Sequence, residues 1–363
     1  MTTFFFRRSV EKAFQLDEPP SGLSLNMSRP VSSNPPFIIS AVDDVMYIVN
    51  AVIQKSISTS QRGVISGVIP TIGRILGSDF ISMIQRKMRD ESYPKAIVQG
   101  GFPPEEKIIS FIVLINSLDM ANEYLARIIT SRVGPSGAQT NGASHPAFLK
   151  DAFPFDHDVT FVVNSLNTLN STFFAQSTEL LNTGLQVLFN QVIKPRLRPV
   201  LSDTFRDADY TLTEEQLAEL AEQNDENEEE ILDQVPRRFE HGWDALMKPI
   251  GRLMTPKTFN TVLEITAQYL ARVLEKRVWS YAGRTSAFGA IRMDRDISGI
   301  VAAVSRGNYG VREVFGKTTQ VLMVANMEDD EWEELSAAPD GEDGMQWVLS
   351  EEERRRARNL VRP

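Results

Sequence analysis

The residues best suited to proton transfer are three histidines, and their positions predict no shared site. His145, His157 and His241 are widely separated and show none of the short intervals typical of metal ligands. Asp156 and Asp158 flank His157, which would be one way to build a proton relay. Adjacent residues on one turn point in different directions, so we favour ordinary histidines in or beside loops and helix surfaces. The sequence has no cysteine that could supply a thiolate.

The glycine-containing segments also lack a catalytic signature. The stretch from Gly134 to Gly142 has neither the lysine of a phosphate-binding loop nor the flanking strand and helix of a dinucleotide site. Gly100 and Gly101, which come before two prolines, predict a turn. No Gly-x-Ser-x-Gly nucleophile motif occurs. We therefore predict that the chain is not an enzyme and that it holds no cofactor and no metal ion.

Acidic side chains are concentrated in two tracts. Residues 207–235 contain 12 acids and residues 327–343 contain 9, and neither tract contains a lysine or arginine. One interpretation is two solvated acidic loops on a mildly basic body, which we favour. The other interpretation is that these tracts dock a basic partner.

A single basic cluster lies near the C-terminus and consists of five arginines, Arg354, Arg355, Arg356, Arg358 and Arg362. The cluster could contact phosphates, which gives an autonomous anionic-lipid or nucleic-acid-binding module as the alternative function. No aromatic stacking platform is interleaved with these arginines, although nucleic-acid recognition usually needs one. We favour a position on the outer face of the last helix, near its negative C-terminal end, and we predict no nucleic-acid partner.

The elements that would position all these residues are predicted to be helices. Apolar residues recur at intervals of three and four along most of the chain, and no stretch alternates with a period of two. Long helices in series build bundles, so the pattern predicts an all-α fold of elongated, stacked helical bundles. Four aromatic residues in these stripes are predicted core anchors: Trp243, Phe259, Phe315 and Trp347.

Helix ends can be proposed at several places. Thr255 before Pro256 predicts an N-cap with proline at the first helical position. Ser40 with Asp43 resembles a capping box, and Pro70 should start or kink a helix. Pro195 and Pro199 are predicted to end a long helix. No run approaches the roughly 18 uninterrupted apolar residues of a membrane span, so any membrane association is expected to be peripheral.

Composition shifts along the chain predict three helical regions. The linker is predicted where glycine and polar residues interrupt the helical pattern, and proline with serine marks a disordered loop. The predicted regions are a bundle over 1–132 with a disordered loop at about 19–36, a linker over 133–157, a second bundle over 158–284 with an acidic insertion at about 207–235, and a small terminal bundle over 285–363 with an acidic loop at about 327–343.

Several segments in the same order resemble subunit four of the conserved oligomeric Golgi complex. The resemblance extends over nearly the whole chain, and no single motif is diagnostic. The segments are FFFRRSVEKAFQLD (4–17), SAVDDVMYIVNAVIQ (40–54), NTGLQVLFNQVIKPRLRPVL (182–201), YGVREVFGKTTQVLMVANM (309–327) and WVLSEEERRRARNLV (347–361). The resemblance implies that residues 1–132 correspond to the middle bundle of this family.

The resemblance also implies a fold and a role. The fold is the helical rod of multisubunit tethering complexes, and the role is vesicle capture in retrograde transport within the Golgi, which supports Golgi organisation and glycosylation. The implied location is peripheral, on the cytosolic face of the Golgi membrane. The implied partners are the other subunits of the complex, SNAREs, Sec/Munc-class proteins and Rab GTPases. The family pattern is already under way at residue 1, so we expect the family's N-terminal coiled-coil portion to lie outside this sequence.

One structural ion pair is proposed on the basis of the resemblance, since the matching arginine of the family lies in the small terminal bundle. Arg312 would pair with Glu353 on the last helix and tie together two elements of that bundle. Ser350 precedes Glu353 by three residues, which is the spacing of a capping box. The alternative is therefore that Glu353 only caps its own helix.

Overall fold

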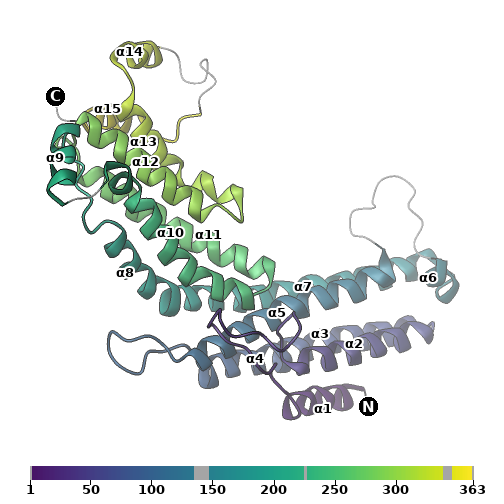
Figure 1. Cartoon of the computed structure of the whole chain (residues 1–363). Coiled ribbons are helices and arrows are strands. Elements are labelled where there is room, and N and C mark those ends of the chain that lie inside the picture. Colours follow the sequence, from purple (N-terminus) through teal and green to yellow (C-terminus); the bar gives the residue numbers. More distant parts are fainter. Residues whose placement is uncertain (1, 135–146, 225–226, 338–345, 362–363) are drawn as a thin grey trace. The chain divides into compact units, whose positions relative to one another are not determined.

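A computed structural model describes residues 2–134, 147–224, 227–337 and 346–361. The described residues form helices and irregular segments, and their only strand-like pairing is one isolated bridge between Thr285 and Val361. The contacts divide the chain into two units (Figure 1). Unit 1 contains Met1–Val192 and Pro249–Phe259, and unit 2 contains Ile193–Lys248 and Asn260–Pro363. The prediction of an all-α fold is confirmed.

Unit 1 is a bundle organised around one long central helix. Its helices are α1 (Thr2–Gln15), α2 (Ser40–Ser58), α3 (Arg62–Ile75), α4 (Ser82–Arg86), α5 (Glu105–Val133), α6 (Ala147–Ala152) and α7 (Asp156–Leu188). Helix α5 packs along α7 and α2, while α3 packs on α7 and α1 covers α2 and α3 (Figure 1). Gly184 of α7 lies in close packing, because a Cβ atom there would lie 2.6 Å from the methyl carbon of Met88 and 3.4 Å from a side-chain carbon of Ile115 on α5.

The helical segment over residues 62–91 corrects one prediction. Pro70 lies inside α3, which neither starts nor ends there. The side chain of Pro70 is exposed, and on the solvent side a carbonyl can tilt away from the helix axis and relieve the clash with a proline ring. Two π-helical stretches flank α4: η1 (Leu76–Ile81) precedes it and η2 (Lys87–Glu91) follows it.

A similar correction applies to the prolines after α7. A π-helical turn, η3 (Phe189–Ile193), follows α7, and α8 (Lys194–Thr204) then continues through both prolines. Pro195 stands in the first turn of α8, where its missing N–H is tolerated. The expected helix end at Pro195 and Pro199 is therefore wrong.

The unit boundary differs from the predicted linker at 133–157. Helix α7 packs along α5 and α3, and these contacts keep it in unit 1 as far as Val192. Val133 is the last residue of α5, and α6 lies within the proposed linker. Residues 135–146 of that segment lie outside the described residues.

The segment over residues 19–36 is irregular, as predicted, but it is ordered and not disordered. Glu105 at the start of α5 accepts hydrogen bonds from Ser24 Oγ at 2.9 Å and from the backbone N–H of Leu25 at 2.7 Å. Arg252 donates to the carbonyl oxygens of Asn26 at 3.2 Å and Arg29 at 3.1 Å. Residues that are distant in sequence therefore hold this segment in place. The proline and serine content of the segment gives no sign of these contacts.

Unit 2 contains the remaining helices. They are α8, α9 (Glu214–Asn224), most of α10 (Glu228–Leu253), most of α11 (Pro256–Ser280), α12 (Ala287–Val304), the 3₁₀ helix η4 (Tyr309–Phe315), α13 (Gly316–Asn326), α14 (Asp329–Ala337) and α15 (Glu351–Arg358). Helix α13 packs against α12, α15 and η4. The ends of α10 and α11 that meet at Met254 and Thr255 belong to unit 1.

The two acidic tracts contain helices and are not simply loops. Helix α9 occupies part of the tract over residues 207–235, and α14 occupies part of the tract over residues 327–343. The first turn of α14 carries Asp329, Asp330 and Glu331, where carboxylates favour the positive end of a helix. The expectation of an acidic loop at 327–343 is therefore corrected, and residues 225–226 and 338–345 lie outside the described residues.

The predicted helix caps have mixed outcomes. Thr255 Oγ1 accepts from the backbone N–H of Thr258, and α11 begins at Pro256 as predicted. The box of Ser350 and Glu353 forms at the start of α15. The box proposed for Ser40 does not form, because Asp17 takes its place. The Asp17 carboxylate accepts from the N–H of Ala41 at 3.2 Å.

Two helical segments are long and apolar enough to cross a membrane by length and composition alone, although neither is an uninterrupted apolar run. They are Arg62–Glu91 and Glu105–Val133. Most of the apolar part of α5 is buried inside unit 1, which is what a central core helix requires.

Candidate functional site

Helix α5 carries a row of buried polar side chains on an otherwise apolar core surface. Asn116 and Ser117 are fully buried, and Asp119 and Asn122 are nearly so. A buried polar group needs a hydrogen-bond partner, since its loss of hydration is otherwise uncompensated. Each of these side chains therefore fixes a neighbouring segment, and together they form the best-defined polar site in unit 1.

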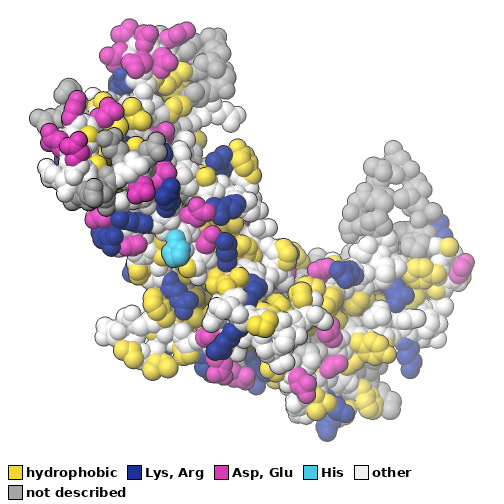
Figure 2. All heavy atoms as spheres, viewed as in Figure 1, with side chains coloured by type: hydrophobic (Ala, Val, Ile, Leu, Met, Phe, Trp, Pro, Cys, Tyr) yellow, Lys and Arg dark blue, Asp and Glu magenta, His cyan; other side chains and the backbone are white. Residues whose placement is uncertain are grey.

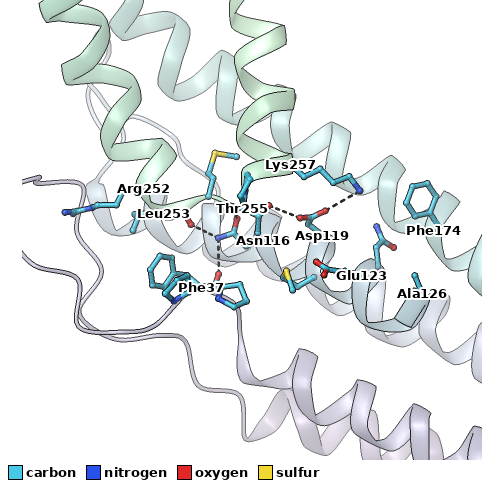
Figure 3. A pocket seen from close by; sticks show the side chains of 16 residues that line it. Phe37, Asn116, Asp119, Glu123, Ala126, Phe174, Arg252, Leu253, Thr255 and Lys257 are labelled. Carbon is cyan, nitrogen blue, oxygen red and sulfur yellow. Dashed lines mark hydrogen bonds and ion pairs between the residues drawn. The ribbon is translucent and has the colours of Figure 1, made fainter. Parts of the chain in front are cut away.

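Asn116 joins three segments of the chain. Its amide nitrogen donates to the carbonyl oxygens of Phe37 at 3.0 Å and Leu253 at 2.7 Å. Its amide oxygen accepts from the backbone N–H of Thr255 at 3.1 Å (Figure 3). Both amide hydrogens and the oxygen are used, so α5 holds the segment before α2 and the turn between α10 and α11.

Asp119 reinforces the same turn one helical turn further along α5. Its carboxylate accepts from Thr255 Oγ1 at 2.7 Å and lies 3.5 Å from Nζ of Lys257 (Figure 3). Lys257 also lies over the ring of Phe174 on α7, with Nζ 5.5 Å from the ring centroid. The buried charge of Asp119 is thus compensated by a hydroxyl and by an ammonium group.

These residues line a cavity of about 710 Å³ within unit 1. Its lining residues are mostly apolar and come from the segment before α2, from α5, from α7 and from the α10–α11 turn (Figure 3): Pro35, Pro36, Phe37, Asn116, Asp119, Met120, Asn122, Glu123, Ala126, Phe174, Arg252, Leu253, Met254, Thr255, Pro256 and Lys257. Asn116 and Asp119 are committed to hydrogen bonds with the α10–α11 turn, so the geometry supports packing and side-chain binding. The sequence signal for this site was two polar residues, three apart, within the apolar stripe of α5.

The structure places the two residues of the proposed ion pair with other partners. Arg312 lies over the ring of Tyr309, and its Nη1 donates to the Tyr309 hydroxyl at 3.3 Å. Glu353 instead pairs with Lys317, with Nζ and Oε1 2.5 Å apart, and accepts from the backbone N–H of Ser350. Glu353 is the third residue of α15, so its carboxylate turns back towards the start of its own helix, while Arg312 remains exposed.

Lys317 is the residue that sequence reasoning missed. It bridges Glu353 and Glu275 of α11, the latter at 3.3 Å, and so connects α13 with two other helices. The hydrogen bond with Lys317 lowers the pKa of Glu353, and the same bond raises the pKa of Lys317. Lys317, the partner of Glu353, lies five residues after Arg312 in the sequence. Helix periodicity gives no reason to prefer a residue at that spacing.

The predicted core anchors divide into two pairs. Trp243 and Phe315 are buried, and Trp243 stacks on Phe239. Phe259 and Trp347 are only partly buried. The guanidinium of Arg354 covers Trp347 at 4.7 Å from the ring centroid. Trp347 therefore lies at the surface of unit 2, because an arginine covers one of its faces in place of a packed helix.

The histidines form no constellation among the described residues. His157 is exposed, stacks on Phe155 and lies 3.2 Å from Asp158. His241 is exposed on α10, and His145 lies outside the described residues. The described part of the chain holds no group of three or more His, Cys, Asp or Glu side chains able to bind a metal ion.

The charged tracts are surface features of unit 2. Acidic side chains gather over α14 and again over α9 (Figure 2). Among the C-terminal arginines, Arg355 pairs with Glu351 and Arg358 with Asp329. Arg356 lies over the ring of Trp279 on α11, and Arg354 covers Trp347, so two of these arginines contact aromatic rings that are not interleaved with them in the sequence. Arg362 lies outside the described residues.

A buried titratable pair lies deeper in unit 2. The hydroxyl of Tyr210 donates to the carboxylate of Asp296 at 2.7 Å, and both side chains are buried. Burial raises the pKa of Asp296 to about 6, against the opposing effects of Tyr210 and Arg292. Arg292 also donates to the carbonyl oxygen of Asp209 at 3.2 Å. These contacts hold the start of the first acidic tract against α12.

Comparison with known proteins identifies the fold and the family. Residues 111–356 match the family model "Conserved oligomeric Golgi complex subunit 4, C-terminal", and residues 1–88 match "COG4 transport protein, middle alpha-helical bundle". The C-terminal domain of the exocyst subunit Sec6p has a similar fold, with a TM-score of 0.51 at 11% identity over 99% of this chain and 86% of that one. The predicted fold of the tethering-complex type is confirmed.

Curated relatives carry the same family name. Conserved oligomeric Golgi complex subunit 4 of Arabidopsis thaliana is 27% identical over 98% of this chain, and that of Schizosaccharomyces pombe is 24% identical over 94%. The chain spans 43% and 41% of those two proteins. Because a family model matches more than half of its residues, the chain belongs to the family of conserved oligomeric Golgi complex subunit 4.

Proposed function

We propose that this chain works as part of a vesicle-tethering subunit of the Golgi. It would support retrograde transport between Golgi cisternae, and with it Golgi organisation and glycosylation, by binding other proteins. The observation that carries this proposal is the pair of family matches, which together cover residues 1–88 and 111–356 in the order of the family. The fold shared with an exocyst subunit domain agrees with it.

The proposed mode of action is binding without catalysis. Asn116, Asp119 and Thr255 line the cavity described above, and their polar atoms bond to one another and to the backbone. The partners we propose are the other subunits of the oligomeric Golgi complex, SNAREs, Sec/Munc-class proteins and Rab GTPases. The proposed location is peripheral, on the cytosolic face of the Golgi membrane.

Affinity purification tests the proposal. The tagged 363-residue chain, expressed in cells of an organism that has its own oligomeric Golgi complex, should recover other subunits of that complex by mass spectrometry. A tagged full-length relative in the same cells is the positive control. If the relative recovers the complex and the chain, shown by circular dichroism to be folded and helical, recovers none of it, the proposal is contradicted.

A further inference from the structure

The loop between η2 and α5, residues 92–104, presents apolar side chains to solvent. Ile97 is 83% exposed and Val98 is 70% exposed, although both are β-branched aliphatic residues that normally lie in a core. In Figure 1 the loop projects beyond the helix ends of unit 1, and Figure 2 shows hydrophobic side chains at its end. Single exposed apolar residues are common, but two adjacent ones at a projecting tip form a local patch.

The tip has a fixed conformation. The N–H of Gly101 donates to the carbonyl oxygen of Val98 at 2.9 Å, and Gly100 has a φ of 80°. These are the features of a type II turn, which requires a positive φ at its third position. The turn constrains the backbone from Val98 to Gly101, which reduces the backbone freedom that this tip would lose when it is buried against a partner.

The base of the loop is anchored in unit 1. Ser92, Pro94 and Pro103 are buried, and Tyr93 contacts Phe111 of α5 edge to face. The ammonium group of Lys107 donates to the carbonyl oxygen of Glu91 across the base. A firm base below an exposed apolar tip is the arrangement of a binding element.

The composition of the loop favours lipid over protein as the partner. Its only charged residue is Lys95, so no carboxylate in the loop opposes a membrane surface. Three of its thirteen residues are prolines, which have no N–H to dehydrate, and the turn bond satisfies two further polar groups at the tip. Of the four acids that flank the loop, Asp90 pairs with Arg89, Glu91 pairs with Lys87, and Glu105 accepts from Ser24 Oγ, which leaves Glu106 exposed at the start of α5.

We propose that residues 92–104 form a membrane-contacting loop, in which Ile97 and Val98 insert into the interfacial region of a phospholipid bilayer. A convex tip fits a deformable bilayer, and the lysine stem of Lys95 can lie along the interface with its charge in water. This inference adds a contact point to the peripheral location proposed above. It does not depend on which proteins the chain binds.

Vesicle flotation of the full 363-residue chain tests the loop. With neutral phosphatidylcholine vesicles, replacing both residues (I97S/V98S) should lower the partition coefficient by roughly tenfold or more, since burial of each aliphatic side chain is worth about a factor of ten. Ile291→Ser on α12 is the matched control, because the Ile291 side chain is 61% exposed and lies outside the loop. This control should leave the partition coefficient unchanged. Binding should change little with salt, whereas binding through the C-terminal arginines would fall steeply.

A site-specific probe gives a second, independent measurement. The sequence contains no cysteine, so Val98→Cys can be labelled alone with an environment-sensitive fluorophore, with Thr130→Cys as the exposed control on α5. The probe at residue 98 should shift to the blue on addition of vesicles and be quenched by spin-labelled lipid, and the probe at residue 130 should not. A probe at residue 98 that stays in water would overturn the proposal.

Protein recovery separates this proposal from the proposed function. Under the lipid proposal, I97S/V98S recovers the same complex subunits as the unmodified chain while losing vesicle binding. If the variant instead loses protein partners and keeps its vesicle partition, the loop is a protein contact and the lipid proposal is wrong.

Discussion

At the scale of single residues, Asn116 shows how a buried amide can join distant parts of a chain. Replacing it with alanine leaves the carbonyl oxygens of Phe37 and Leu253 and the N–H of Thr255 without their partner. We expect Asn116→Ala to lower the free energy of unfolding by about 3 kcal/mol, because unsatisfied buried polar groups are costly. Urea denaturation measures this, and Asn167→Ala at an exposed position of α7 should change it by less than about 0.5 kcal/mol. Equal losses in the two variants would contradict the role of Asn116.

Asp296 leads to a prediction about pH. Its pKa is about 6 in the folded chain, above the ordinary value of 3.8 for an aspartate side chain, so the folded state binds this proton more tightly. The stabilisation by protonation is complete below pH 3.8 and is lost as the pH rises through 6. Relative to Asp296→Asn, the unmodified chain should therefore gain about 2 kcal/mol of unfolding free energy between pH 7 and pH 4.

The measurement is urea denaturation of both chains at a series of pH values. Asp151→Asn, at an exposed position, should follow the unmodified chain throughout. A difference between Asp296→Asn and the unmodified chain that does not vary with pH would exclude a buried titrating carboxylate.

The candidate site could be predicted only in part, for a reason visible in these same residues. The apolar stripe of α5 was evident from spacing, and so was the Thr255 cap at the start of α11. The partners of Asn116 lie 79 and 137 residues away, and no local pattern encodes such distances. The prediction of an Arg312–Glu353 pair was wrong for a related reason. The carboxylate of Glu353 is already used by Lys317 and by the backbone N–H of Ser350.

At the scale of elements, the periodicity of apolar residues predicted most helices, whereas irregularities in them were missed. Spacing at three and four identifies which face is buried, and the all-α fold followed from this. The helix start considered at Pro70 and the helix end predicted at Pro199 were wrong, because a helix can keep an exposed proline by tilting a carbonyl. The helices within the acidic tracts were missed because charge alone suggested solvated loops.

The packing of α7 on α5 makes an element-scale prediction at Gly184. A valine there would bring its Cβ within 2.6 Å of the Met88 methyl carbon and 3.4 Å of Ile115. We expect Gly184→Val to lower the free energy of unfolding by about 1–3 kcal/mol through overpacking. Gly63→Ala in α3 is the contrasting control, since nothing lies within 4 Å of an added Cβ there.

The control should move in the opposite direction, with a gain of about 0.5–1 kcal/mol from the better helix propensity of alanine. Thermal and urea unfolding measure both changes. A Gly184→Val chain as stable as the unmodified one would mean that α7 lies further from Met88 and Ile115 than described.

At the scale of the whole molecule, the chain returns to unit 1 after entering unit 2. Residues Pro249–Phe259 belong to unit 1, although the sequence on both sides of them belongs to unit 2. A division of the sequence into consecutive domains cannot represent this return. The physical basis of this return is a set of hydrogen bonds that hold the α10–α11 turn within unit 1. Asn116 and Arg252 donate in these bonds, and Asp119 accepts.

Arg252 provides the test of this organisation. Its guanidinium donates to the carbonyl oxygens of Ser24, Asn26 and Arg29, more than 220 residues away in sequence. Removing these charge-assisted bonds in Arg252→Ala should release residues 20–37 and accelerate their amide hydrogen exchange by roughly 30-fold, which corresponds to about 2 kcal/mol of local stability. Exchange in α12 of unit 2 should not change.

Arg237→Ala, on the same helix α10 but within unit 2, should leave residues 20–37 protected. If Arg252→Ala also accelerated exchange in α12, the two units would open together, and the division at Lys248 and Pro249 would not describe how the chain unfolds.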